Sequence, residues 1–231
     1  GLLNNKFTVD APLSKINSDG YIDRATSDLQ SYYLSGGYYG KKSFIRFNTM
    51  SGSEKTYQSW NGTPESRITG NREDMLAYIE RNGLSPEDAD NLLNSGRTYN
   101  AYTYPNETDN YKQTHYQLIT SHTLNKNLTF NINGFLVRGK GHYEQFRKDD
   151  ELGNYKIDPI QIGNETITSS DLVRQRWLSN YFYGSTFSFD YNSFKRFTAN
   201  VGGGWTQYDG DHFGDVVWAR FSGNSNVRHR Y

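Results

Sequence analysis

The stretch Arg-Gln-Arg-Trp-Leu-Ser-Asn-Tyr-Phe-Tyr-Gly-Ser-Thr-Phe-Ser-Phe-Asp-Tyr, residues 174–191, carries the pattern that decides the fold. Large rings recur at its odd positions, whereas its even positions are mainly small or polar. Successive side chains of a β-strand point to opposite faces, so this alternation predicts a strand with one aromatic and one polar face. The next stretch, Lys195–Gln207, repeats the pattern with Phe197, Val201 and Trp205 on one parity.

The same period of two recurs along the chain and predicts about seven strands. They are Phe7–Leu13, Gln30–Tyr39, Ser43–Thr49, Thr114–Thr123, Leu128–Val137, Arg174–Tyr191 and Lys195–Gln207. In Leu128–Val137 the parity that begins at Thr129 is polar at first and becomes apolar at Phe135 and Val137. The polar parity of these strands is rich in Asn, Thr, Ser and Gly, which is typical of a hydrated or plugged pore.

Loop length alternates along the chain. The connections Tyr38–Ser43, Leu124–Leu128 and Tyr191–Phe197 are tight, whereas polar excursions occupy about 17–27, 51–112, 147–170 and 208–231. Short turns at one end and long loops at the other are typical of a transmembrane β-barrel, whose periplasmic turns are short and whose extracellular loops are long. The sequence therefore predicts an all-β fold over 1–231, an antiparallel up-and-down transmembrane β-barrel that is partial. A soluble antiparallel sheet explains the alternation, but not the one-sided loops.

The longest loop carries the pattern of a helical hairpin. Asn71 is a candidate N-cap before Arg72, and Asn82-Gly83 ends the first helix. Ser85-Pro86 begins a second helix, which ends at Asn94-Ser95-Gly96. We expect an ordered lid or rim at the barrel mouth.

Composition and motifs exclude several function classes. The chain has 25 basic and 25 acidic residues, so no net charge favours a nucleic-acid partner. Cysteine is absent, which removes thiolate metal sites and a cysteine nucleophile. No apolar run approaches 18 residues, and no catalytic constellation of nucleophile and base is present. We expect no enzyme activity, no cofactor and no metal site.

Aromatic residues in the longest loop are the candidate ligand-binding residues. Rings at a barrel mouth can stack on a small nutrient, and the chain offers Tyr57, Trp60, Tyr99, Tyr102 and Tyr104 in this loop. Aromatic loops of any protein with this composition would look similar, so a purely structural role for these rings stays open.

Several segments together resemble the first barrel strands of TonB-dependent outer-membrane receptors of the Bacteroidota type. The segments that carry the resemblance are Ile16–Arg24, Ser27–Tyr33, Glu54–Gly62, Asn91–Asn100, Asp109–Leu118, Gly139–Phe146, Arg176–Gly184 and Asp215–Arg220. Each segment is weak alone, but the combination covers essentially the whole chain.

The resemblance implies a plugged barrel of the 22-stranded class in the outer membrane. It implies import of a scarce nutrient, such as a ferric siderophore, cobalamin or a glycan, with energy delivered by the TonB complex. The partners would be outer-membrane lipid, a plug domain and TonB outside this segment, and the nutrient. We expect the chain to be the N-terminal part of the barrel without its plug. Two alternatives remain: a soluble aromatic-rich glycan-binding β-module, and a passive porin or adhesin barrel.

Overall fold

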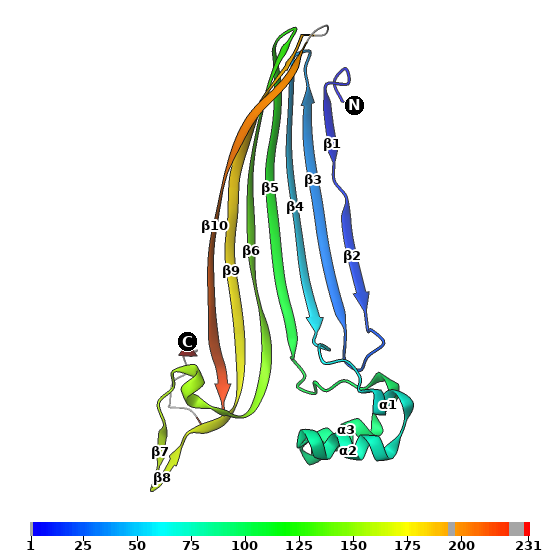
Figure 1. Cartoon of the computed structure of the whole chain (residues 1–231), viewed down its shortest axis with the longest axis vertical. Coiled ribbons are helices and arrows are strands. Elements are labelled where there is room, and N and C mark those ends of the chain that lie inside the picture. The colour runs from blue at the N-terminus through cyan, green and yellow to red at the C-terminus, as the bar shows by residue number, and fades with distance from the viewer. Residues whose placement is uncertain (1, 194–196, 222–228) are drawn as a thin grey trace.

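The computed structural model describes residues 2–193, 197–221 and 229–231, and is dominated by one antiparallel sheet (Figure 1). Its long strands pair in chain order, each with the next. They are β3 (Ser27–Tyr39), β4 (Ser43–Tyr57), β5 (Thr108–Asn125), β6 (Leu128–Glu151), β9 (Ser169–Asn192) and β10 (Thr198–Ala219). Over the described residues this sheet is open rather than closed. The expectation of an all-β, antiparallel, up-and-down partial barrel is confirmed.

A seventh, interrupted strand lies beside β3. It consists of β1 (Phe7–Asp10) and β2 (Leu13–Ser18), which both pair with β3. The interruption falls at Pro12, which has no backbone N–H to donate to a ladder. Its carbonyl still accepts from the backbone N–H of Tyr33 at 3.0 Å, so the strand continues past the break. At the other edge, the short β11 (His229–Arg230) pairs with β10.

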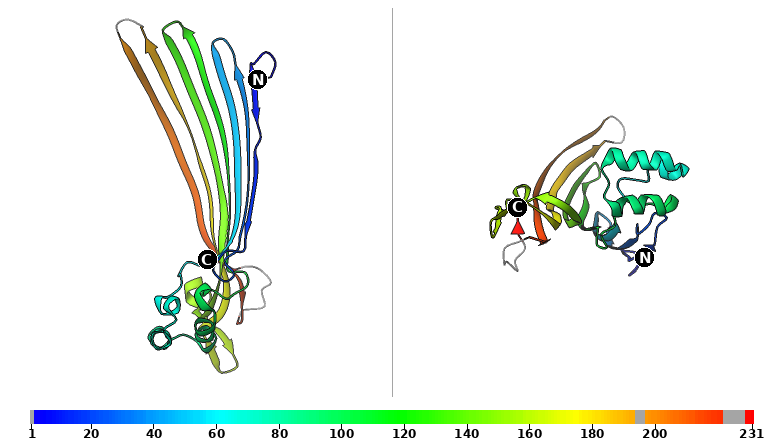
Figure 2. Two further views of the ribbon diagram at one scale, coloured as in Figure 1. Left: turned by 90° about the vertical axis from the view of Figure 1, so that its right-hand side faces the viewer. Right: turned by 90° about the horizontal axis from the view of Figure 1, so that it is seen from below.

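The two ends of the sheet differ as the loop lengths predict (Figures 1 and 2). At one end, here called the tight-turn end, residues 40–42 join β3 to β4 and residues 126–127 join β5 to β6. The third tight connection, Tyr191–Phe197, includes residues 194–196, which lie outside the described residues. The long excursions and all the helices lie at the opposite, loop end.

The strands reach farther toward the loop end than the sequence indicates. The expected loops 51–112 and 147–170 are too wide, because β4 runs to Tyr57, β5 begins at Thr108 and β6 runs to Glu151. The expected loop 208–231 is wrong over residues 208–219, which are strand. This Asp- and Gly-rich segment looks like a loop in sequence, but its register with β9 continues from Tyr208 opposite Phe182 to Val216 opposite Arg174. Cross-strand pairing thus overrides the local turn propensity.

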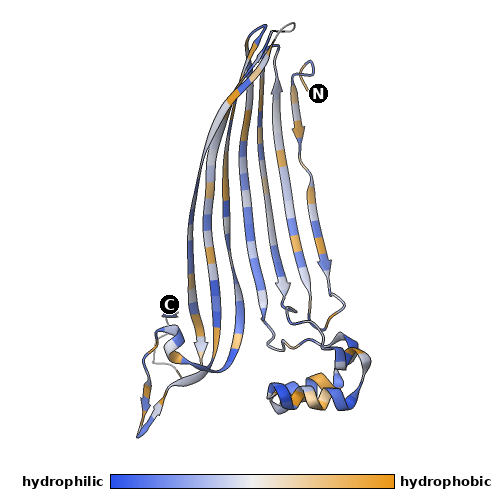
Figure 3. Cartoon of the chain, viewed as in Figure 1, coloured by the Kyte–Doolittle hydropathy of each residue, from blue (hydrophilic) through white to orange (hydrophobic). Residues whose placement is uncertain are grey.

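The register assigns every strand residue to one of two faces, because directly opposed residues share a face. The ring face contains Phe189 of β9, which lies opposite Phe130 of β6 and Val201 of β10. Its large apolar side chains are exposed, for example Ile132 at 45%, Phe187 at 46% and Val201 at 69%. Figure 3 shows the resulting alternation of hydropathy along the strands. So much contiguous exposed apolar surface is unusual for a protein in water and indicates contact with an apolar partner.

The polar face is tied together by side-chain hydrogen bonds near the tight-turn end. Asn48 is buried, and its Oδ1 accepts from the hydroxyls of Tyr33 at 3.0 Å and Ser35 at 2.8 Å. Asn131 donates to Asp190 at 2.5 Å and to Ser188 at 3.0 Å, linking β6 to β9. A polar wall linked by such side-chain hydrogen bonds suits a hydrated or plugged interior.

Glycines indicate the direction in which the sheet curls. A Cβ added at Gly184 would lie 2.3 Å from the carbonyl oxygen of Trp205, and one at Gly202 would lie 2.4 Å from that of Phe187. Both glycines belong to the polar face, so neighbouring strands crowd together on that side. The sheet therefore curls toward its polar face and leaves the rings on the convex side, and it forms an arc when seen end-on (Figure 2).

The expected helical hairpin is confirmed. Between β4 and β5 lie α1 (Glu65–Thr69), α2 (Arg72–Asn82), α3 (Pro86–Asn94) and the 3₁₀ turn η1 (Gly96–Thr98). Asn71 caps α2 by accepting from the backbone N–H of Glu73 at 3.0 Å, and Gly83 ends it with a left-handed φ of 59°. We call residues 58–107, which join β4 to β5, the helical lid. Its core is formed by Met75, Leu92 and Tyr99.

The second excursion contains the 3₁₀ turn η2 (Leu152–Tyr155) and a small hairpin of β7 (Ile160–Ile162) and β8 (Glu165–Ile167). Among the residues that the structure describes, no helix is both long and apolar enough to span a membrane.

Candidate functional site

The polarity of the two faces reverses toward the loop end. On the polar face, β6 changes from Asn131 and Asn133 to Phe135 and Val137, as its sequence indicates. The opposed residues of β9 change in parallel, from Thr186 to Phe182 and Leu178. The ring face becomes charged over the same distance, for example at Lys140. Toward the loop end, where the ring face is no longer apolar, rings and aliphatic groups therefore line the concave side of the sheet.

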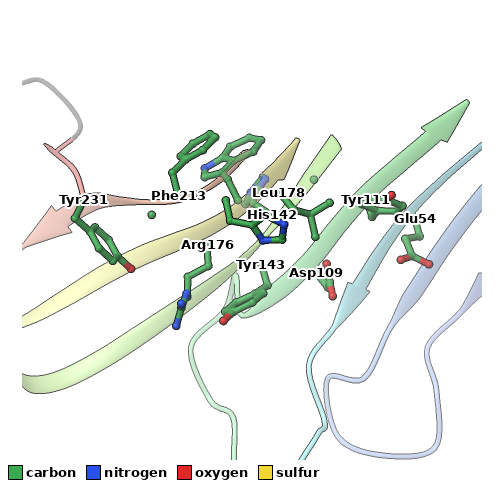
Figure 4. A pocket seen from close by; sticks show the side chains of 13 residues that line it. Glu54, Asp109, Tyr111, His142, Tyr143, Arg176, Leu178, Phe213 and Tyr231 are labelled. Atoms are coloured by element: carbon green, nitrogen blue, oxygen red, sulfur yellow. The ribbon is translucent and has the colours of Figure 1, made fainter. Parts of the chain in front are cut away.

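A groove of about 680 Å³ lies on this concave side near the loop end (Figure 4). Its chemical groups are two carboxylates, several rings and one guanidinium, supplied by Glu54, Asp109, Tyr111, Tyr143, Arg176 and Tyr231. Figure 4 shows Asp109, Tyr143 and Arg176 projecting to the same side of the sheet. Burial raises the pKa of Asp109 above its ordinary value, although the nearby His142 opposes the shift.

Rings rest directly on bare backbone in this groove. A Cβ at Gly141 would meet the Tyr111 side chain at 2.7 Å, and one at Gly214 would meet the Tyr231 ring at 2.1 Å. The backbone of Gly214 also exchanges two hydrogen bonds with Tyr231, at 3.1 and 2.9 Å. Glycine at these two positions is what allows the rings to lie flat along the wall and define the groove.

Arg176 is the cation available in this groove. It makes no ion pair within the described part of the chain, and Tyr143 and Tyr231 line the groove with it. A guanidinium offers several fixed N–H donors and binds carboxylate, phosphate or other oxyanions readily. The groove can therefore hold an anionic group against aromatic surfaces.

A second groove, of about 660 Å³, lies between the helical lid and the ends of β6 and β9. Its cations already have partners: Arg147 pairs with Asp150 at 2.9 Å, and Lys148 pairs with Glu87 of α3 at 3.8 Å. The Lys148–Glu87 pair joins the lid to β6. Because both of its members are exposed, the pair contributes little stability and can open readily.

The five aromatic residues expected to bind ligand separate into two groups. Tyr57 and Tyr99 are buried: the Tyr57 hydroxyl donates to the carbonyl of Tyr104 at 2.7 Å, and Tyr99 packs in the lid core. Their rings are not available to a ligand in this conformation. Trp60 is 56% exposed, and Tyr102 and Tyr104 line the second groove.

Trp60 connects the lid to the sheet. Its ring makes edge contacts with Tyr102, at 6.4 Å between centroids, and with Tyr143 of the first groove, at 5.3 Å. Tyr143, Arg176 and Tyr231 were missed by sequence reasoning. For Tyr143 an indication existed, since the polar parity of the preceding stretch already becomes apolar at Phe135.

Two side chains, the buried Asn100 and the exposed Arg24, hold the lid against the sheet. Asn100 donates to the backbone carbonyls of Asp23 at 2.9 Å and Gln58 at 3.0 Å, so it joins the lid to the β2–β3 connection. Arg24 donates to the carbonyls of Tyr102 at 2.9 Å and Asn100 at 3.1 Å. These bonds hold the base of the lid in place. They do not involve the helices α1, α2 and α3.

On the side of the lid that leads into β5, Glu144 of β6 accepts hydrogen bonds at the lid base. Its carboxylate accepts from Gln175 at 2.6 Å, Asn106 at 2.7 Å and Tyr104 at 2.9 Å. Burial would raise its pKa, but these hydrogen bonds outweigh burial and hold the pKa below its ordinary value. The nearby Glu107 differs, because burial raises its pKa to about 7.

Comparison with known proteins supports the fold. No protein-family model matches the chain, and no curated protein gives a significant sequence match. In structure, it is similar to the ferric-catecholate import receptor Fiu of E. coli K12. The closed form matches with a TM-score of 0.58 at 13% identity, over 94% of this chain and 29% of the receptor. The open form matches with a TM-score of 0.59 at 14% identity, over 94% and 31%.

The chain thus spans less than a third of the receptor structures that it matches. At this level of identity the likeness establishes the fold alone. Both matched structures are of the same import receptor, in its closed and open forms. The chain has the fold of a segment of the matched β-barrel.

Proposed function

We propose that the chain forms part of the wall and outer lid of an outer-membrane receptor that imports a scarce nutrient with energy from the TonB complex. The tight-turn end would face the periplasm, and the helical lid would face the outside. The nutrient would be a ferric siderophore, cobalamin or a similar compound. The plug domain and the TonB complex would be partners outside this segment.

The observation that carries the proposal is the height of the apolar band on the convex ring face. In β9 the band runs from Tyr181 to Tyr191, ten residue steps or about 33 Å along the strand. With the 35–45° strand tilt of outer-membrane barrels, this corresponds to about 23–27 Å along the membrane normal. The apolar belt of such barrels is about 25 Å tall, so the band fits one bilayer core.

Ligand capture would take place at the first groove and the rim above it. Arg176 would bind an anionic group of the nutrient, while Tyr143 and the exposed Trp60 would offer ring surfaces. Of the other rings, Tyr102 and Tyr104 would border the entrance, whereas Tyr57 and Tyr99 would hold the lid. Import would then follow a population shift in the plug that opens a path, with no covalent step.

The experiment uses the full-length receptor that contains this chain. Its gene would be expressed in a Gram-negative host that lacks its own siderophore receptors. We expect the protein in the outer membrane and uptake of a labelled ferric siderophore or cobalamin that stops when TonB is deleted. Uptake that continues without TonB would indicate the porin alternative. A protein that stays soluble and binds oligosaccharides would indicate the glycan-binding alternative.

The site is tested separately with Arg176→Gln in the same receptor. We expect weaker binding of an anionic ferric chelate, with normal assembly in the outer membrane. Arg72→Gln serves as a matched control, since Arg72 is exposed at the start of α2 and lies outside both grooves. Equal affinity of wild type and Arg176→Gln would contradict the assignment of this groove.

A further inference from the structure

Three cations gather on the convex face just beyond the apolar band. Lys112 of β5 and Lys140 of β6 lie directly opposite each other in the register. Arg138, also of β6, lies on the same face two residues closer to the tight-turn end. We call these three residues the cation cluster. Like charges placed directly opposite on neighbouring strands repel, so this arrangement destabilises an isolated sheet in water.

No acidic side chain of the described chain neutralises the cluster. None of its members takes part in an ion pair among the residues that the structure describes. On their other sides, the two lysines have uncharged neighbours in the register: Ser53 lies opposite Lys112, and Ser179 lies opposite Lys140. The nearest acidic residues of this face on β10, Asp209 and Asp211, lie one strand farther away.

The cluster is oriented along the wall by aromatic contacts. The Arg138 guanidinium lies 4.2 Å from the centroid of the Tyr181 ring and donates to the Ser179 hydroxyl at 2.9 Å. The Lys140 ammonium lies 5.5 Å from the Trp177 ring. Lys112 and Lys140 are exposed, so their ammonium groups remain accessible.

The cation cluster lies at the border of the apolar band that is nearer the loop end. Tyr181 and Tyr116 end the band on this face, as aromatic residues do where a barrel meets the headgroup layer. Arg138 lies directly opposite Tyr181, and Lys140 lies two residues farther toward the loop end. The cations therefore stand at the depth where headgroups begin, directly above rings that contact acyl chains.

We propose that the cation cluster binds the phosphate groups of a lipid in the leaflet next to the loop end. This inference rests on the proposed function, which makes that leaflet the outer one. A phosphorylated glycolipid of the lipid A type has both required parts: phosphates for Lys112, Arg138 and Lys140, and acyl chains for the rings below. A bound phosphate would also remove the repulsion between Lys112 and Lys140.

The test uses the full-length receptor, extracted from outer membranes and transferred into an uncharged detergent. Binding of lipid A is measured by native mass spectrometry for wild type and for Lys112→Gln/Lys140→Gln. The matched control is Lys41→Gln/Lys42→Gln, which removes the same charge at the tight-turn end. Because each cation near a phosphate layer contributes about 1 kcal/mol, the first variant should bind about 30-fold more weakly. The control variant should bind as wild type does.

A second measurement keeps the result interpretable. In lipid-free detergent, Lys112→Gln/Lys140→Gln should be at least as heat-stable as wild type, because it loses only a repulsion. Added lipid A should stabilise wild type more than this variant. Equal lipid affinity of the two proteins would overturn the inference. Inorganic phosphate that binds as tightly as lipid A would overturn the assignment to a lipid.

The two proposals fail in different ways. A receptor that never reaches the outer membrane contradicts the proposed function. A receptor that inserts, imports its nutrient and binds lipid A equally well with and without the two lysines contradicts only this inference.

Discussion

Replacing Phe187 by lysine places a charge at the centre of the surface that we assign to hydrocarbon. Phe187 is 46% exposed on the convex face, opposite Ile132 and Gly203. It lies four residue steps from Tyr191, about 13 Å along the strand or about 10 Å along the membrane normal at a 40° tilt. In a core about 25 Å thick, this is within about 3 Å of the midplane.

The expected cost follows from that depth. A lysine at the midplane of a lipid-facing barrel surface costs about 2–4 kcal/mol, which corresponds to a factor of about 30 to 1,000 in an equilibrium constant. The loss of the Phe187 ring over Gly203, where an added Cβ would meet it at 3.3 Å, adds to this cost. Thr186→Lys is the matched control, because Thr186 is the adjacent residue and faces the polar interior.

The assay is the amount of heat-modifiable full-length receptor in outer membranes, together with the midpoint of urea unfolding from lipid vesicles. Phe187→Lys should assemble poorly and unfold at lower urea, whereas Thr186→Lys should remain close to wild type. If the two variants behave alike, or if Thr186→Lys is the worse of the two, the assignment of the convex face to lipid is wrong.

Three further outcomes are expected. Asn48→Ala should lower stability by about 1–3 kcal/mol, because the buried Ser35 hydroxyl and the half-buried Tyr33 hydroxyl lose their shared acceptor; an unchanged unfolding midpoint would contradict this role. Burial raises the pKa of Glu107 from 4.5 to about 7, so the stability that protonated Glu107 contributes to the lid base should be fully present below pH 4.5 and be lost as the pH rises through about 7. Limited proteolysis of the lid should therefore accelerate across that window in wild type, and Glu107→Gln should abolish the dependence. Gly184→Ala should reduce assembly, because its Cβ would lie 2.3 Å from a backbone oxygen, whereas Gly52→Ala, with no atom within 4 Å, should be tolerated.

Most of the sheet could be predicted from local pattern. The alternation in residues 174–191 correctly separates the two faces of β9, and the tight connections correctly predict which strands are neighbours. The caps of α2 and α3 were predictable because a cap is a contact within three residues. Asn71 accepts from Glu73 and Asp74, and Ser85 accepts from Asp88.

The strand ends at the loop end could not be predicted in this way. From Tyr208 to Ala219, Gly and Asp residues reduce the propensity for strand, and the alternation loses its contrast because the ring face is no longer apolar. The segment is a strand because β9 extends beside it and supplies a partner at almost every residue. That partner lies far away in the sequence, so no local pattern reports it.

The candidate site was predictable only in part for the same reason. The loop rings were visible in the sequence, but which of them are buried depends on contacts between distant segments. Tyr99 packs against Met75 and Leu92 of the lid, whereas Trp60 contacts Tyr143 of β6. Arg176 shows nothing unusual in the sequence. Its role emerges only when Tyr143 and Tyr231 line the same groove.

The reversal of polarity within single strands explains why the groove is built on the sheet rather than on the loops. The backbone ladder of β6 and β9 is continuous from the apolar band to the loop end, so only the side chains change where the surroundings change. In β6 the convex side changes from Ile132 to Lys140, while the concave side changes from Asn131 to Tyr143. A site held by a strand ladder is positioned more accurately than one held by a loop. Arg176 and Tyr143 are therefore positioned by the wall rather than by the lid, and ligand affinity should depend on these two residues.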